Sequence, residues 1–181
     1  MSPYAFYQYF LNVEDSKVIE YLKIFSERPR AEIEELAQSA AENPHRREAQ
    51  RALADDVTRL VHSEGDRASA EAAGLAVFGR GDLLAIDSAT MSALFDQLGG
   101  STLESQDLTV VDALVSAGVV ESRSAARRAI AEGGAYLNNN RIDDADCVLS
   151  DSDLLAGGYA MLRRGKRNVG LIRVNSSVHA H

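Results

Sequence analysis

Residues 108–138 read LTVVDALVSAGVVESRSAARRAIAEGGAYLN, and this stretch decides the fold of the C-terminal part of the chain. Apolar residues in 108–115 recur at helical spacing, and Gly118 is placed to end that helix. Ser122 can cap a second helix, which Gly133 and Gly134 end. The stretch therefore predicts two short helices followed by a change to extended structure.

The residues that follow predict a small sheet. Strand-like segments occur at 135–137, 141–142, 159–164 and 168–174. The three asparagines at 138–140 and the Gly-Lys-Arg at 165–167 are typical of turns. Two helices and a short, mainly antiparallel sheet make a small α+β domain over 108–175, and we expect 176–181 to be a disordered tail.

The first hundred residues predict helices instead. Ser2 and Pro3 form a helix start. Tyr4, Phe6, Tyr7, Phe10 and Leu11 then recur at helical spacing, which favours a core over a base-stacking platform. A further helix is expected over 30–42, directly after Pro29. Another is expected over 43–62, which is the longest stretch with helical periodicity. The change of composition at 99–102 places an all-helical domain at 1–98 and a linker at 99–107.

Charge is divided unevenly along the 181 residues. Residues 1–107 carry 10 Lys and Arg against 19 Asp and Glu, whereas residues 108–181 carry 9 against 8. The net charge of −8 therefore conceals a C-terminal part that is nearly neutral and gathers its arginines at a few points. A local basic surface can bind nucleic acid even when the whole chain is acidic.

Arginine suits phosphate because its planar fork donates two hydrogen bonds and never loses its charge. The predicted 123–131 helix carries Arg123, Arg127 and Arg128, and the hairpin carries Arg163, Arg164, Lys166 and Arg167. Strand alternation should turn only one of Arg163 and Arg164 toward RNA. In the helical domain the candidate contacts are Arg46, Arg47 and Arg51. A solvated helix face is the alternative for these residues, and the pattern alone leaves it open.

Several other kinds of site are not supported by the sequence. The lone Cys147 has no pattern of catalytic neighbours, and His179 and His181 lack a third ligand, so no metal site is expected. No run of about 18 apolar residues and no signal peptide is present. A cytoplasmic protein with no membrane partner is therefore the expectation.

The stretch from Val111 through Asn138, with L-V-x-x-G-V-V-x-S-R-S-x-A-R-R-x-I-x-x-G-G-x-Y-L-N in it, resembles the RNA-binding domain named after small-subunit ribosomal protein four. The hairpin string Y-A-M-L-R-R-G-K-R-N at 159–168 fits the same family. The resemblance implies a surface for structured RNA. Its contact candidates are Arg123, Ser124, Arg127, Arg128, Asn138, Arg141, Arg164 and Lys166, and Arg167 joins them as a turn residue.

The first domain is similar to bacterial tyrosyl-tRNA synthetases in three strings. They are S-P-Y-A-F-Y-Q-Y-F-L-N-V at 2–13, Y-L-K-I-F at 21–25 and R-E-A-Q-R-A-L-A-D-D-V-T-R-L-V-H at 47–62. The resemblance implies a helical anticodon-binding domain followed by the RNA-binding domain, with tyrosine tRNA as partner and no DNA. A stand-alone module for structured RNA is the alternative.

That family also has a catalytic domain, which uses ATP and Mg²⁺ and is marked by H-x-G-H and K-M-S-K-S. Neither motif occurs in this sequence. We therefore expect no cofactor in this chain and no aminoacylation by it alone, with the catalytic domain of the same enzyme as a further candidate partner.

Overall fold

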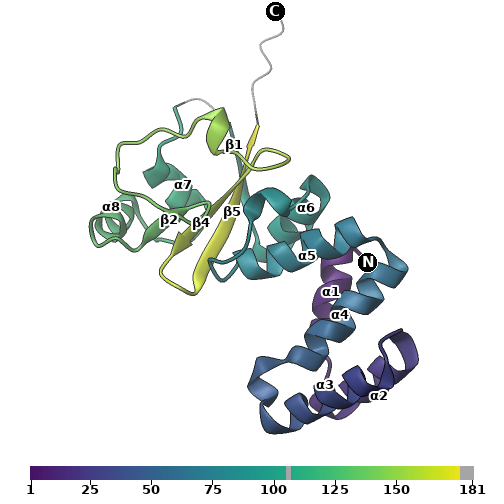
Figure 1. Cartoon of the computed structure of the whole chain (residues 1–181). Helices are drawn as coiled ribbons and strands as arrows, with labels where there is room; N and C mark the ends of the chain where they lie inside the picture. The colour runs from purple at the N-terminus through teal and green to yellow at the C-terminus, as the bar shows by residue number, and fades with distance from the viewer. Residues whose placement is uncertain (105–106, 176–181) are drawn as a thin grey trace, which may run out of the picture. The chain divides into compact units, whose positions relative to one another are not determined.

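The computed structural model of the chain describes residues 1–104 and 107–175. They form two compact units, Met1–Glu71 and a second unit that begins at Ala72. The division falls inside helix α5 (Glu64–Ala76; Figure 1), whereas the change of composition had suggested a boundary after residue 98. The expected tail at 176–181 lies outside the described residues.

Unit 1 is helical, as predicted. Its elements are α1 (Pro3–Leu11), α2 (Asp15–Phe25), α3 (Arg30–Glu42), the 3₁₀ turn η1 (Pro44–Arg46), α4 (Glu48–Val61) and the first part of α5. Ser2 caps α1, because its side-chain oxygen accepts a hydrogen bond from the Ala5 amide at 3.2 Å. Proline at the first position of α1 loses nothing, since its missing N–H would have no partner in the helix.

Helix α4 is the centre of unit 1 and packs against α1, α2 and α3. Leu53 and Val57 on its apolar face form one cluster with Val18 and Leu22 of α2 and Ile33 of α3. The aromatic residues of α1 are core residues, as expected: Tyr4 and Tyr7 are buried, and Phe6 and Phe10 pack against the cluster. Burying a side chain of leucine size stabilises a fold by about 1.5–3 kcal/mol.

The expectation of one continuous helix over 43–62 is wrong. Arg47 has a left-handed backbone (φ 52°), which separates η1 from α4. The Arg47 guanidinium explains the break, because it donates to the carbonyl oxygens of Leu11 and Val13 at 2.9 and 3.4 Å. These bonds satisfy carbonyls at and just beyond the C-terminal end of α1, where the helix has no partners for them.

Unit 2 contains the sheet. After η2 (Leu83–Ala85) and α6 (Ser88–Leu98) come β1 (Ser101–Glu104), α7 (Val110–Ser116), α8 (Arg123–Ala131), β2 (Ala135–Leu137), β3 (Asn140–Arg141), η3 (Asp151–Asp153), β4 (Tyr159–Arg164) and β5 (Asn168–Asn175). The strand order is β1-β5-β4-β2-β3. Only β1 is parallel to its neighbour, so the α+β class with a mainly antiparallel sheet is confirmed. Strand β1 occupies part of the segment that was expected to be a linker.

Both faces of this sheet are covered. Ala160, Leu162 and Ile172 join the cluster that α7 and α8 form on one face. The opposite face carries Tyr159, whose ring lies 5.5 Å from that of Phe95 in α6. Because β4 is apolar on both sides, α6 has to pack on the sheet, and it therefore belongs to unit 2. Among the described residues, no helix is long and apolar enough to cross a membrane.

A partly buried charge network closes the end of unit 1. The Arg67 guanidinium lies 3.0 Å from Asp55, 2.8 Å from Glu64 and 2.8 Å from Glu71, and its side chain is only 15% exposed. Burial raises the pKa of Asp55, whereas the hydrogen bond from Arg67 opposes that rise. Burial also raises the pKa of Tyr7, which donates to Asp55. Arg67 is therefore the cation that allows Asp55 to stay ionised there.

We expect Arg67→Met to lower the free energy of unfolding of unit 1 by about 2–3 kcal/mol at neutral pH, less than for a fully buried pair. The loss should shrink as pH falls, because Asp55 without its cation has a still higher pKa in the folded state and gains a proton first. Chemical denaturation followed by circular dichroism at several pH values measures both effects. The control is Arg30→Met: Arg30 is 92% exposed, so its loss should change stability by less than about 0.5 kcal/mol.

Candidate nucleic-acid interface

Helix α8 presents four of the predicted contact residues to solvent. Ser122 caps the helix by accepting from the Ala125 amide at 3.2 Å, as predicted. The helix buries Ala126, Ala129 and Ile130 against the sheet. Burial of that face leaves the remaining positions exposed, and they carry Arg123, Ser124, Arg127 and Arg128.

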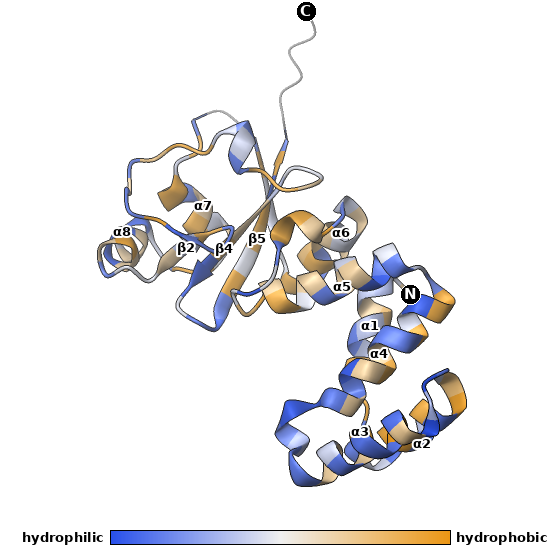
Figure 2. Ribbon diagram, in the orientation of Figure 1, coloured by the Kyte–Doolittle hydropathy of each residue, from blue (hydrophilic) through white to orange (hydrophobic). Residues whose placement is uncertain are grey.

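The loop after α8 brings the other basic residues together. The Gly165 amide donates to the Gly134 carbonyl oxygen at 2.8 Å, which places the β4–β5 turn beside this loop. The Arg141 guanidinium lies against Gly133, where an added Cβ would be 2.9 Å from its Cζ. We call the exposed basic residues gathered by these contacts the hairpin cluster; they are Arg141, Arg164, Lys166 and Arg167. The turn is hydrophilic in Figure 2.

Three of the predicted contact arginines form ion pairs with acids of the same unit. The pairs are Arg123 with Asp112 at 2.7 Å, Arg127 with Asp146 at 2.9 Å and Arg141 with Asp143 at 2.9 Å. All three guanidinium groups stay more than half exposed, so the pairs are weak, about 0–1 kcal/mol each. A phosphate could replace each carboxylate at little cost.

The side chain of Asn138, one of the predicted contact residues, is bonded within the protein. Its backbone is left-handed (φ 48°), and its side-chain amide donates to the Asp153 carbonyl oxygen at 2.6 Å. The side-chain oxygen accepts from the Met161 amide at 2.9 Å. Both ends of the amide thus hold the β2–β3 turn to its neighbours, and the residue serves the shape of the surface.

Strand alternation separates Arg163 and Arg164 as expected. Arg164 is exposed at the end of β4, whereas Arg163 is 8% exposed and its guanidinium lies 4.1 Å from the centre of the Tyr136 ring. Arg163 and Tyr136 are direct partners across β4 and β2. Only Arg164 of this pair is therefore available to a ligand.

The arginines of unit 1 are partly occupied by the protein itself. Arg47 donates to carbonyl oxygens at and beyond the end of α1, Arg51 donates to the Arg46 carbonyl oxygen at 3.4 Å, and Arg46 lies 3.6 Å from Glu48. Arg46, Arg47 and Arg51 all remain exposed. Hydrogen bonds from the Arg47 guanidinium hold the segment between α1 and α2, so fewer of its N–H groups are available to a phosphate.

That segment borders a depression of about 460 Å³. It is lined by Gln8, Tyr9, Asn12, Val13, Glu14, Lys17 and Tyr21. Tyr9 is 62% exposed, although the neighbouring aromatic residues of α1 are core residues. An exposed ring beside amide, carboxylate and ammonium groups can stack on a base and bond to its edge. The exposure of Tyr9 could have been predicted from the sequence, because helical spacing places it outside the set of α1 residues that face the core.

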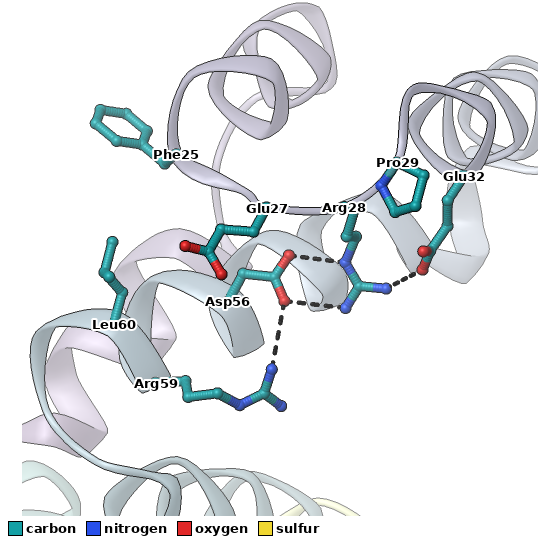
Figure 3. A pocket seen from close by; sticks show the side chains of 8 residues that line it. All are labelled: Phe25, Glu27, Arg28, Pro29, Glu32, Asp56, Arg59 and Leu60. Carbon is teal, nitrogen blue, oxygen red and sulfur yellow. Dashed lines mark hydrogen bonds and ion pairs between the residues drawn. The ribbon is translucent and has the colours of Figure 1, made fainter.

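A second depression of unit 1, about 570 Å³, lies between the α2–α3 connection and α4 (Figure 3). Arg28 donates to both carboxylate oxygens of Asp56 at 2.7 and 3.0 Å and also pairs with Glu32. The hydrogen bond to Asp56 raises the pKa of Arg28. Arg59 approaches Asp56 at 3.8 Å. These cations are neutralised by the lining itself, so this depression is a poor site for phosphate.

Comparisons with known proteins account for both units. Residues 1–79 match the family described as tRNA synthetases class I (W and Y), and residues 90–172 match the Tyrosine–tRNA ligase SYY-like C-terminal domain. The chain belongs to the tyrosine–tRNA ligase family. It corresponds to the C-terminal region of these enzymes, as the sequence strings had indicated.

Two relatives illustrate the match to tyrosine–tRNA ligases. The tyrosine–tRNA ligase of Cutibacterium acnes is 56% identical over 94% of this chain, and that of Kineococcus radiotolerans is 48% identical over 96%. The chain spans about 41% of the length of each. A solved tyrosyl-tRNA synthetase C-terminal domain is 32% identical, with 53% of this chain and 97% of that domain covered and a TM-score of 0.41.

The internal ion pairs lead to a prediction about affinity. Replacing Asp143 and Asp146 by asparagine should strengthen binding of structured RNA by about three-fold or more at low salt, because Arg141 and Arg127 no longer have a competing carboxylate. Fluorescence anisotropy with a labelled RNA measures this change.

The control removes the same charge elsewhere in unit 2. Asp96 and Asp107 are exposed and take part in none of the ion pairs found in the described chain, so Asp96→Asn with Asp107→Asn should have a smaller effect. Equal gains in both double variants would show that net charge alone is responsible.

Proposed function

We propose that this chain is the part of a tyrosine–tRNA ligase that binds tyrosine tRNA, and that it contributes recognition and not chemistry. The observation that carries the proposal is the hairpin cluster joined to the α8 arginines, in a chain whose net charge is −8. Exposed arginine and lysine side chains on ordered elements can neutralise phosphates, and no long loop has to lose conformational entropy when they bind.

The surface favours structured RNA over isolated single strands. The candidate face of unit 2 is made of a helix, a loop and a hairpin turn whose exposed groups are charged. One side of the Tyr136 ring is taken up by the Arg163 guanidinium, and the residue is only partly exposed. Such a face reads the path of a folded phosphate backbone.

Unit 1 supports a second kind of contact. Tyr9 and its neighbours offer a ring and hydrogen-bonding groups in one depression, which suits an unpaired base. We infer that this depression and the exposed Arg46 and Arg51 form the contribution of the helical unit, in agreement with the anticodon-binding role implied by the family resemblance. Base identity would then be read in unit 1 and phosphate position in unit 2.

We assign the activation of tyrosine to the part of the related enzymes that this chain does not span. This chain spans about 41% of their length, and the H-x-G-H and K-M-S-K-S motifs do not occur in it. ATP, Mg²⁺ and tyrosine would accordingly bind to a catalytic domain, which we propose as the second partner of this chain. Restoration of aminoacylation on mixing the two parts would test that partnership.

Replacing Arg127 and Arg128 together by alanine should weaken binding of tyrosine tRNA by about ten-fold or more, at roughly 1–3 kcal/mol for charged contacts. The slope of log affinity against log salt should also become less steep by about one to two units. Filter binding at several salt concentrations measures both quantities. Arg30→Ala serves as the control, because Arg30 is 92% exposed and lies in the other unit, on α3.

Competition between RNAs separates the two candidate functions. Tyrosine tRNA should displace a bound label at lower concentration than other tRNAs or ribosomal RNA fragments of similar length. Equal displacement by all of these RNAs would favour a general module for structured RNA and contradict the assignment to tyrosine tRNA.

Replacing Tyr9 by alanine should weaken tyrosine tRNA binding by about five-fold or more, the lower end of the energy of one stacked base. Tyr9→Phe keeps the ring and should retain most of the affinity. Because Tyr9 carries no charge, the salt dependence should stay unchanged in both variants. Full affinity in Tyr9→Ala would remove this depression from the interface.

A further inference from the structure

Arg163 is buried beside the exposed basic turn between β4 and β5. Its Nη1 donates to the Gly165 carbonyl oxygen at 2.5 Å, and its guanidinium lies 4.1 Å from the centre of the Tyr136 ring. Only 8% of the residue is exposed. The residue therefore links strand β2, on which the ring stands, to the first residue of the β4–β5 turn.

The charge of Arg163 is held without a carboxylate. None of the ion pairs found in the described chain includes this residue, and its buried Nε has no hydrogen-bond partner among the described groups. A buried cation with incomplete bonding is unfavourable unless its surroundings hold it in place. The ring of Tyr136 and the Gly165 carbonyl supply the favourable contacts that remain.

A third contact fixes the position of the guanidinium. An added Cβ at Gly79 would lie 2.8 Å from Nη2 and 2.9 Å from Cζ of Arg163. Gly79 also has a left-handed backbone (φ +74°), so only glycine suits this position well. The chain that follows α5 thus closes directly on the guanidinium.

We propose that Arg163 is a positioning residue for RNA binding: it fixes the β4–β5 turn so that Lys166 and Arg167 point to the phosphates, and it does not touch RNA itself. The proposal rests on the proposed function of the hairpin cluster. Arg164, its neighbour in sequence, is exposed and acts by direct contact. Two adjacent arginines in one strand would then have different roles because the strand turns them to opposite faces.

The first test needs no RNA. In the free full chain, Arg163→Met should make the amides of Gly165, Lys166 and Arg167 mobile, which lowers their ¹⁵N heteronuclear NOE, while the turn at 138–140 keeps its values. Tyr136→Leu removes the ring and should loosen the same three amides, and it replaces Arg163→Met if that variant does not fold. Unchanged values in the folded variants would overturn the proposal.

The second test is a binding cycle with tyrosine tRNA. Arg163→Met should weaken binding about ten-fold in the natural chain, comparable to the loss of one charged hydrogen bond. In the Lys166→Ala, Arg167→Ala background, the same substitution should change affinity less than about two-fold, because the groups that it positions are gone. A persistent ten-fold loss in that background would show direct contact with RNA and overturn the proposal.

Arg163→Lys provides the matched control for charge. Lysine keeps the positive charge but lacks the planar fork that stacks on Tyr136 and reaches the Gly165 carbonyl. It should therefore behave like Arg163→Met in both tests, and full binding with an ordered turn would contradict positioning by the guanidinium. If the natural chain fails to bind tyrosine tRNA, the relaxation measurement still decides whether Arg163 holds the turn, which separates the two proposals.

Discussion

The arrangement of unit 2 depends on one constraint, the burial of strands β4 and β5 on both faces. Five of the six residues of β4 are buried, so neither face of the sheet can be left to solvent. Helices α7 and α8 cover one face, and α6 with the chain after α5 covers the other. The faces of the sheet and the inner sides of these helices are therefore buried against one another. The exposed side of α8 and the strand ends remain for a ligand, and the basic residues are found there.

Acidic and basic residues balance each other on this surface at low cost. Two of the α8 arginines, Arg123 and Arg127, and Arg141 already have carboxylate neighbours, which reduces the positive charge that these three residues present. Because exposed pairs contribute little, a closely spaced row of phosphates can compete with them. The carboxylates would then weaken non-specific binding of single phosphates more than they weaken binding of a ligand that contacts many arginines together.

Much of this could be read from the sequence, and the failures have physical causes. Capping by Ser2 and Ser122 and the hairpin at 159–174 follow local rules, and the structure confirms them. The break at Arg47 depends on carbonyl groups more than thirty residues away, which no local pattern contains. Assignment of α6 to the sheet could have been inferred, because the unbroken apolar run in β4 indicates a strand that is covered on both sides. Asn138 and Asn139 were expected in a turn, but the bonds that occupy the Asn138 amide come from residues distant in sequence.

Arg163 and Arg164 show why composition alone cannot assign roles within a basic cluster. The two side chains are chemically identical and adjacent, yet one is exposed and the other lies between a tyrosine ring and a glycine that follows α5. A buried guanidinium needs partners within the protein, and it finds them in the ring and in the turn that carries Lys166 and Arg167. The order of that turn thus comes from the same packing that covers the second face of the sheet. The proposed contacts of the exposed residues with RNA would in this way depend on how the buried one is held.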